Sequence, residues 1–387
     1  MRILLLLLTG LFGFVSESHA VGQWEQKASF GGWGRHRAVA VGIGNKVYAG
    51  MGHLNGDGSD EWYPEWWEFD PASNCWTQKA DYIGNNGNGD QDLTAIAIDG
   101  IGYVGLGQFS DETHFKYNPM TNTWTQIADA PSASFTNTDP FVLNGKGYFP
   151  SFFTAIDSLY EFDPVLDTWT AVAEMPVSVG HRDATFTIDS KGYFKKGTQF
   201  FEFDPATNLW TPKAPFPGIA PNNNIGLSQM GYGFLIGGYL GWGDMYQEVW
   251  RYDPTLDTWE QLPDYPFAKR RWAVKAKVGE RCYVGLGTSG TNYNDFWEFD
   301  QFTGLDDFDV EKFQAFPTLA NDHVSFVSEN KNEFEILIFN SLGKRINSIT
   351  SENGSVRLNR NGLSSGVYLY QVIQNDKVLH SDRFVFN

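Results

Sequence analysis

A glycine-containing stretch with a Tyr or Phe recurs six times along the chain, and six residues of interest each lie eleven positions before that aromatic residue. They are Arg37, Asp92, Asn137, Arg182, Asn223 and Trp272, with Arg271 beside the last. Guanidinium groups bind carboxylates through paired hydrogen bonds, and they also suit the polar groups of a sugar. Gathered at one opening, the set would hold a carboxylate or a sugar. Polar residues that only satisfy strand ends and bind water would leave the same pattern, so both interpretations remain open.

Aromatic residues in long, variable segments form a second set of candidates. They are Trp33, Trp62, Tyr63, Trp66, Tyr239, Trp242 and Tyr246. Exposed aromatic rings beside amides and acids suit sugar stacking or a protein hot spot. We therefore expect Trp62, Trp66 and Trp242 to bind ligand together with the polar set. Packing within the loops is the alternative role for these rings.

Catalytic and metal chemistry have little support in the sequence. The histidines show no paired metal spacing, and Ser-His-Asp or phosphate-loop patterns are absent. The stretch "NGDGSDE" (55–61) offers oxygen ligands without the spacing of an EF-hand, so we interpret it as an Asx-rich turn. We expect no metal and no cofactor, and no catalytic residue is assigned.

A repeated phrase indicates the elements that position these residues. "EFDPATNLWT" begins at Glu202, near-copies begin at Glu68, Lys116, Glu161 and Arg251, and a shortened "EFDQFTG" begins at Glu298. Before each phrase lies an apolar hairpin with a tight Gly, Asn or Asp turn. One unit is then four strands, a to d, in which Asp-Pro ends strand c and the Trp of strand d covers the neighbouring sheet. The loops d–a and b–c share one face, where a site is expected.

This pattern resembles the kelch repeat, whose signature is a glycine pair, a Tyr, and a Trp that follows a Tyr-Asp-Pro turn. The resemblance implies an all-β protein with a six-bladed kelch-type β-propeller over residues 21–302. The sixth phrase has no Trp, whereas "GQWEQKA" near the N-terminus has Trp24 without the rest of the phrase. We therefore expect the N-terminal strand to complete the last blade and close the ring.

Two enzyme classes share this type of propeller. Copper radical oxidases need a Tyr–Cys cross-link and histidine ligands, but Cys75 and Cys282 both lie inside repeat elements, which disfavours that activity. We interpret both cysteines as buried free thiols. Sialic acid mutarotases need only polar residues at the channel mouth, and Arg37, Arg182 and Arg271 would suit the carboxylate of a sialic acid.

The two ends of the chain indicate export. Residues 1–20 combine a basic start, an apolar run and a small-residue end, as signal peptides do. The net charge of -18 argues against binding of nucleic acid or of an anionic membrane. We expect a polar linker at 303–312 and a small Ig-like β-sandwich at 313–387. "ILIFNSLGKRI" (336–346) and "LSSGVYLYQV" (363–372) look like the C-terminal sorting domain of type IX secretion, with an unrelated adhesion module as the alternative.

The function that these observations favour is binding. We expect a monomeric kelch propeller, secreted or on the outer surface of a Gram-negative bacterium, which binds an extracellular glycan or protein. Residues 313–387 would engage the secretion machinery, and no membrane span is expected in the mature chain. A carbohydrate-active enzyme of the mutarotase type is the alternative.

Overall fold

The computed structural model describes residues 23–300 and 313–387, except 56–59, 111, 132–134, 153–156, 220–221, 242, 317–318, 329–332, 341–344, 352 and 375–376. Within these residues the chain forms strands β1 to β34 and one short 3₁₀ helix, η1 (Asn85–Gly87). It divides into two compact units, the first ending at Thr303 and the second beginning at Gly304. The expected signal peptide (1–20) and the whole of the expected linker (303–312) lie outside the described residues.

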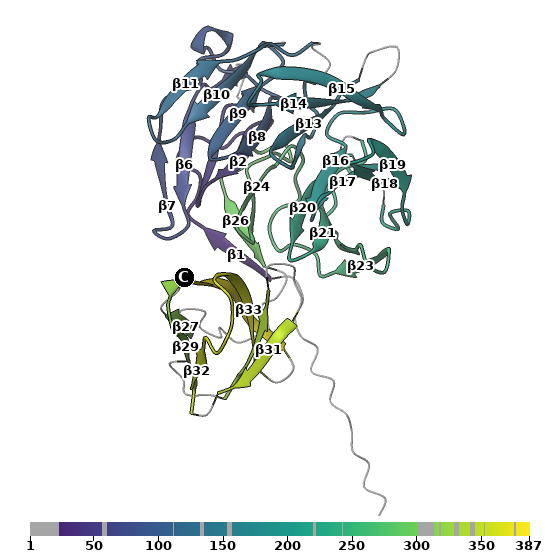
Figure 1. Ribbon diagram of the computed structural model, residues 1–387. Helices are drawn as coiled ribbons and strands as arrows, with labels where there is room; N and C mark the ends of the chain where they lie inside the picture. The colour runs from purple at the N-terminus through teal and green to yellow at the C-terminus, as the bar shows by residue number, and fades with distance from the viewer. Residues whose placement is uncertain are drawn as a thin grey trace, which may run out of the picture. The chain divides into compact units, whose positions relative to one another are not determined.

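Six four-stranded antiparallel sheets make up most of the described part of the first unit, with a small hairpin of β4 (His53–Asn55) and β5 (Asp60–Trp62) in addition. Figure 1 shows how the sheets of this unit are arranged. The first sheet contains β2 (Val39–Ile43), β3 (Lys46–Gly50), β6 (Trp66–Asp70) and β7 (Cys75–Gln78); the second contains β8 (Thr94–Ile98), β9 (Ile101–Gly105), β10 (His114–Asn118) and β11 (Thr123–Gln126); the third contains β12 (Phe141–Leu143), β13 (Lys146–Pro150), β14 (Ser158–Asp163) and β15 (Thr168–Glu174). The fourth contains β16 (Ala184–Ile188), β17 (Lys191–Lys196), β18 (Gln199–Asp204) and β19 (Leu209–Pro212); the fifth contains β20 (Ile225–Gln229), β21 (Tyr232–Ile236), β22 (Val249–Asp253) and β23 (Thr258–Leu262); the sixth contains β24 (Val274–Val278), β25 (Arg281–Gly285), β26 (Phe296–Asp300) and β1 (Gln23–Lys27).

The first strands of the six sheets contact one another in a closed cycle, in the order β2, β8, β12, β16, β20, β24 and back to β2. Small residues allow this close approach. A Cβ atom at Gly42 would lie 1.8 Å from the carbonyl oxygen of Lys277, and one at Gly226 would lie 2.3 Å from that of Thr185. The inner strands therefore meet backbone to backbone around a common centre.

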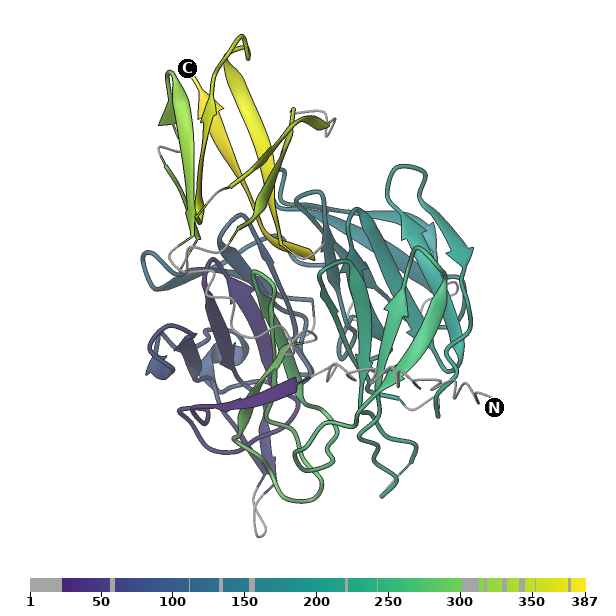
Figure 2. The ribbon, with the colours of Figure 1, turned by 90° about the horizontal axis from the view of Figure 1, so that it is seen from below.

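The N-terminal strand β1 pairs with β26, near the C-terminal end of the same unit, and Figure 2 shows this pairing from a second direction. Trp24 lies opposite Phe299 in the register, and its ring packs against Phe299 and Phe267 at centroid distances of 4.8 and 5.1 Å. Trp24 thus takes the place in the sixth sheet that the Trp of the repeated phrase takes in the others. The sixth sheet is assembled from both ends of the unit.

In four of the six sheets the repeated phrase bonds to an alanine in the segment that leads into that sheet. In the second sheet, Asn122 accepts a hydrogen bond from the backbone N–H of Ala80 (2.9 Å), and the Trp124 indole donates to the carbonyl of the same Ala80 (2.9 Å). The same pair of bonds reaches Ala28, Ala128 and Ala214 from the first, third and fifth sheets. We call this arrangement the alanine clamp. The Asn122 backbone is left-handed (φ 54°), which Asn and Asp tolerate best among residues with a side chain.

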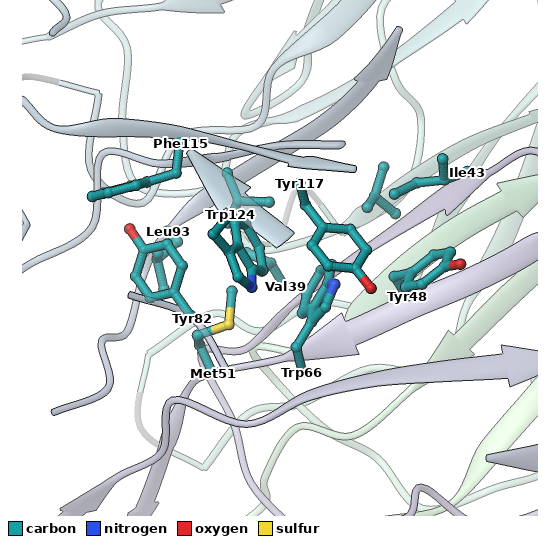
Figure 3. Packing of buried hydrophobic residues seen from close by; sticks show 12 residues of the cluster. Val39, Ile43, Tyr48, Met51, Trp66, Tyr82, Leu93, Phe115, Tyr117 and Trp124 are labelled. Carbon is teal, nitrogen blue, oxygen red and sulfur yellow. The ribbon is translucent and has the colours of Figure 1, made fainter. Parts of the chain in front are cut away.

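Aromatic side chains fill the space between adjacent sheets. Between the first and second sheets, Trp66 is fully buried against Tyr117 and Trp124, as Figure 3 shows, with Tyr82 covering the outer side. Such large rings contribute much of the buried apolar area that holds neighbouring sheets together. These contacts give the rigid frame on which the loops stand.

The second unit consists of two sheets around one core. One contains β27 (Phe313–Phe316), β29 (His323–Ser328) and β32 (Ser355–Asn359); the other contains β28 (Leu319–Ala320), β34 (Lys377–Phe386), β33 (Gly366–Gln374), β30 (Glu335–Phe339) and β31 (Arg345–Thr350). Phe326 of the first sheet packs against Tyr370 of the second at a ring-centroid distance of 4.9 Å. Alternate residues of β30 and β33 face this core, which makes the unit a β-sandwich.

Candidate functional site

The six residues that lie eleven positions before the aromatic of each repeat occupy equivalent points in the structure, shortly before the inner strand of each sheet. Arg37, Asp92, Asn137, Arg182, Asn223 and Trp272 all have left-handed backbones, with φ between 50° and 60°. The N–H of Asp92 donates to the carbonyl of Arg37 (3.0 Å). In the same way, the N–H of Asn137 donates to the carbonyl of Asp92, and the N–H of Arg182 donates to the carbonyl of Asn137. A shared and uncommon conformation, linked from sheet to sheet, places these residues around one end of the central channel.

Arg182 crosses that end of the channel instead of pointing away from it. Its guanidinium donates to Asn137 Oδ1 (2.8 Å), to the carbonyl of Ala273 (3.3 Å) and to that of Ala38 (3.4 Å). It also lies 3.8 Å from the carboxylate of Asp92. These partners come from the third, sixth, first and second sheets, so Arg182 connects four sheets to its own. Burial lowers its pKa, although the group remains cationic.

A second cation lies within the channel. The Lys275 ammonium donates to Asp139 (2.6 Å) and to the carbonyls of Thr185 and Gly226 (both 2.9 Å). Arg182 and Lys275 both line an inner cavity of about 80 Å³. The two side chains obstruct the channel at successive depths.

A larger cavity, the outer cavity, lies on the loop face and has a volume of about 540 Å³. Its lining consists of His36, Arg37, His53, Asn55, Gln91, Gln108, Arg271, Trp272, Thr288 and Gly290. These residues belong to the sixth, first and second sheets, which are neighbours in the ring. Of the polar set expected from sequence, Arg37 and Arg271 line the outer cavity, while Arg182 and Asn223 line the inner one. Asp92 and Asn137 hold the arginines in place.

Paired residues explain why these side chains converge. His36 and His53 form an antiparallel bridge in the first sheet, and Arg271 and Thr288 form the same bridge in the sixth. In the second sheet the N–H of Gln108 donates to the carbonyl of Gln91 (3.0 Å). In each pair, one member directly precedes the left-handed residue. The other member directly follows the Gly-x-Gly end of the second strand. The fifth sheet has the equivalent pair Asn222 and Tyr239.

Trp272 is the centre of the charged part of the outer cavity. The guanidinium carbons of Arg37 and Arg271 each lie 4.1 Å from its ring centroid, and the His36 ring stacks on it at 5.1 Å. Asn223 Oδ1 fixes the Trp272 backbone by accepting its N–H (2.9 Å). Cation–π contacts of this kind hold guanidinium groups while leaving their N–H edges available to a ligand.

The two arginines in the lining of the outer cavity stand out in an acidic protein. Burial lowers the pKa of His36 to about 3, and the pKa of His53 is also lowered chiefly by burial, so both imidazoles are neutral at pH 7. Arg37 forms an ion pair with Asp92, and Arg271 adds a second guanidinium group to the lining. Since the whole chain carries -18, two guanidinium groups in one cavity mark a site suited to an anion.

The side-chain oxygen of Gln91 is a buried atom of the lining without a hydrogen-bond partner within the described residues. The Gln91 amide nitrogen donates to Gln108 Oε1 (2.5 Å), but Gln91 Oε1 accepts no hydrogen bond from any described group, although the residue is only 6 % exposed. A buried acceptor left without a donor costs about 1–3 kcal/mol, so a ligand hydroxyl at this point would be favoured.

The loop aromatics do not act as one group. The prediction for Trp66 is wrong, because it is fully buried as the first residue of β6 and has no access to ligand. Trp62 is half-buried and stacks on His53 at 5.4 Å, so it supports the cavity wall. Trp242 lies outside the described residues. Trp33 is 70 % exposed, and the ring of Tyr63 lies under the Arg35 guanidinium.

Tyr239 and Tyr246 lie in the loops of the fifth sheet, and both are half-buried. The Tyr239 ring centroid lies 5.6 Å from the Arg271 guanidinium carbon, so it supports that arginine. The carbonyl of Tyr246 accepts a hydrogen bond from the Tyr265 hydroxyl (2.9 Å), which is a packing role. Sequence reasoning missed His36, His53 and the glutamines. The signal for His53 and Gln108 was the position directly after a Gly-x-Gly element, and that for His36 and Gln91 was the position directly before the left-handed residue.

Groups that could bind a metal ion or react as thiols are few in the described part of the chain. Its residues contain no group of three or more His, Cys, Asp or Glu side chains placed to hold a metal ion. Both cysteines are free, but only Cys282 is buried; Cys75 is exposed, because it begins the outer strand β7. No helix of the described residues is long and apolar enough to cross a membrane.

Comparison with known proteins gives a family for the second unit and a fold for the first. Residues 314–387 match the family described as secretion system C-terminal sorting domain. The second unit is a type IX sorting domain. Such domains mark proteins that are secreted to the cell surface or to the outside, which confirms the expected location. A comparison with curated proteins finds no match.

The first unit is similar to a solved structure, that of YjhT. The two share 17% identity with a TM-score of 0.56, and the match covers 70% of this chain and 96% of that chain. At this identity the likeness speaks for the fold alone. The first unit has a kelch-like β-propeller fold, as the repeat predicted.

Proposed function

We propose that this protein is a secreted or surface-attached β-propeller that binds an acidic glycan in the outer cavity. The observation that carries the proposal is the placement of Arg37 and Arg271 at equal distances from Trp272 in a cavity of about 540 Å³. Two guanidinium groups from neighbouring sheets suit a carboxylate, and the amides and imidazoles around them suit hydroxyl groups.

A concave site favours a glycan over a protein partner. The cavity volume lies within the range of about 300–1,000 Å³ that is usual for small-ligand sites. Gln91 Oε1 has no hydrogen-bond partner among the described residues and lies in this concave lining, where a sugar hydroxyl reaches more readily than the broad surface of a protein. Trp33, which is strongly exposed in its loop, is not part of the lining.

The propeller would consist of six blades, each corresponding to one of the six sheets, with β1 closing the last. The sandwich of residues 313–387, which we propose to be Ig-like, would engage the secretion machinery. Residues 1–20 would act as the signal peptide for the first export step.

A mutarotase activity on a sugar acid is the second candidate. Proton transfer to and from the ring oxygen and the anomeric hydroxyl needs a general acid–base group near neutral pH. His53 lines the cavity as a neutral imidazole, with its Nε2 atom 3.3 Å from the Asp60 carboxylate. This arrangement supports the candidate, which uses the same carboxylate site.

Calorimetric titration of the purified mature protein tests the proposal. The panel contains N-acetylneuraminate, glucuronate and galacturonate, with N-acetylmannosamine and glucose as neutral counterparts. We expect an acid to bind, and Arg271→Gln and Arg37→Gln to weaken it roughly tenfold or more, because hydrogen bonds to charged groups are worth about 1.5–3 kcal/mol.

Arg251→Gln is the matched control, because Arg251 pairs with Glu260 on the outer strands of the fifth sheet. Equal binding of acids and neutral sugars, or full binding by Arg271→Gln, would contradict the proposal. Exchange between anomers, followed by NMR in the same samples, separates a binding protein from a mutarotase.

A further inference from the structure

The His36 imidazole lines the outer cavity with one ring nitrogen bonded and the other without a partner. Its side chain is 2% exposed, and Nδ1 lies 2.9 Å from the side-chain oxygen of Asn292. No described residue forms a hydrogen bond with His36 Nε2. A buried polar atom of the lining is thus left for a ligand.

Asn292 determines which nitrogen of His36 carries the proton. Its Nδ2 atom donates to the carbonyl of Asn55 (3.3 Å), and because a carbonyl can only accept, the side-chain oxygen of Asn292 must face His36. That oxygen is also only an acceptor, so the proton of the neutral imidazole lies on Nδ1. His36 Nε2 then has a lone pair and is a hydrogen-bond acceptor.

The surroundings of His36 keep it neutral and hold its ring in place. Burial lowers its pKa to about 3, and the charges of Arg37 and Arg182 act in the same direction, against the bond from Asn292. The ring stacks on Trp272 at 5.1 Å and contacts the His53 ring at 5.0 Å. A ring packed against two others keeps its nitrogens at fixed positions, so the acceptor has a defined place in the lining.

Gln91 imposes the same requirement at a second point of the lining. Its amide nitrogen donates to Gln108, which leaves Gln91 Oε1 as an acceptor without a partner among the described residues. A ligand group that covers an acceptor without donating a proton leaves it unsatisfied, and such a ligand is disfavoured. Besides its two guanidinium groups, the cavity therefore offers acceptors that need donors.

We propose that His36 is a specificity-determining residue of the outer cavity, which selects acidic sugars with a free hydroxyl group facing Nε2. This inference rests on the proposed function and deepens it. The hydroxyl donates its proton to Nε2, whereas an acid that is methylated or acetylated at that oxygen has no proton to donate and is rejected. Asn292, which is not part of the lining, is a positioning residue because it keeps the proton of His36 on Nδ1.

Titration calorimetry with deoxyfluoro analogues of the panel acids tests this selection. Fluorine replaces one hydroxyl at a time, with little change in size and no proton to donate. We expect replacement at one position to weaken binding roughly tenfold or more, as the loss of one buried hydrogen bond does. His36→Phe keeps an aromatic ring beside Trp272 but has no acceptor, so this variant should bind the acid and that analogue with equal affinity.

NMR of the protein labelled with ¹⁵N in its histidines tests the position of the proton. The resonances of His36, identified by their loss in His36→Phe, should show a protonated Nδ1 and an Nε2 that shifts when the acid binds. Those of the exposed His181 should not shift, which makes them the control. Asn292→Leu should give a mixture of both tautomers and reduce the discrimination between the acid and its analogue.

Three results would overturn the inference while the proposed function stands, provided that a panel acid binds. They are a proton on Nε2 of His36, equal binding of all analogues by the parent protein, and unchanged discrimination in His36→Phe. If no acid binds, both the inference and the proposed function are wrong.

Discussion

His114 is a buried imidazole in an entirely aromatic cage. Phe149, Phe162 and Trp169 surround it at ring-centroid distances of 5.3 to 5.9 Å, and the side chain is fully buried. Neither ring nitrogen has a hydrogen-bond partner within the described residues. Leaving such groups unsatisfied costs about 1–3 kcal/mol each, so this position lowers the stability of the propeller.

His114→Phe should therefore stabilise the protein. The equivalent residue is Phe200 in the fourth sheet and Phe296 in the sixth, so a phenyl ring suits the position. We expect a gain of about 1–2 kcal/mol in the free energy of unfolding, measured by urea denaturation. His181→Gln, a change at an exposed histidine, is the control. A less stable His114→Phe would show that the imidazole makes a favourable contact.

The same residue makes stability depend on pH. Burial lowers the pKa of His114 to about 3 in the folded state, below the unfolded value of about 6.5. This contribution to the stability of the folded state is fully present above pH 6.5, where the imidazole is neutral in both states. It is lost as the pH falls toward 3, because the unfolded state then binds more protons than the folded state. His36, with a pKa of about 3, adds a second loss in the same range. His114→Phe should remove one of the two contributions and flatten the decline between pH 6.5 and 4.

At the scale of elements, the alanine clamp explains why the phrase with Asp-Pro and Trp recurs. Asn122→Ala should lower the free energy of unfolding by about 1–2 kcal/mol, because the variant loses bonds to Ala80 and Tyr117 and strains a left-handed backbone. Asn122→Gly keeps the backbone freedom but not the bonds. The stability of Asn122→Gly, measured by thermal denaturation, should lie between that of the parent protein and that of Asn122→Ala. If Asn122→Gly is as stable as the parent, the whole effect of Asn122→Ala comes from backbone strain.

The tryptophans of the repeated phrase are expected to be structural. They are Trp76, Trp124, Trp169, Trp210 and Trp259, which occupy one position of the repeat. Trp124→Ala should cost about 3–5 kcal/mol, as truncation of large buried aromatics does, while ligand affinity stays unchanged in the folded fraction. Lost binding with unchanged stability would reverse this assignment.

Strand β1 completes the sixth sheet, so its removal should expose β26. We expect deletion of residues 21–30 to cause unfolding or aggregation, because the unpaired edge at Phe296–Asp300 would then meet other chains. Light scattering and melting temperature measure the effect. An unchanged melting temperature would contradict closure by β1.

Much of the fold could be predicted because the copies of the repeat within this one chain can be aligned with one another. The count of eleven residues located the left-handed ring, since each sheet begins with the same turn. Trp66 was misassigned because the start of strand c looks like loop sequence when only the phrase that follows is aligned. The outer cavity was missed for another reason: it depends on which of six equivalent pairs carry long polar side chains and lie next to one another, and chain order alone does not give the depth of a cavity.

For the whole molecule, the sorting domain should act in export and not in ligand binding. A variant that ends at Thr303 should fold and bind ligand as the full chain does, because the first unit has its own ring of cores. It should accumulate in the periplasm, as measured by fractionation of cells and medium. Normal appearance at the surface, or loss of binding, would contradict this division of roles.

The pairing of Gln23 with Asp300 also sets the order of events when the protein is made. The first strand to leave the ribosome finds its partner only after the last blade has been synthesised, so no nascent fragment can complete the ring. Closing so long a loop carries an entropic cost that grows with the logarithm of its length, and such distant contacts slow folding. Until that moment β1 remains unpaired and open to chaperones and proteases. The ring can thus close only in a chain that extends at least to Asp300.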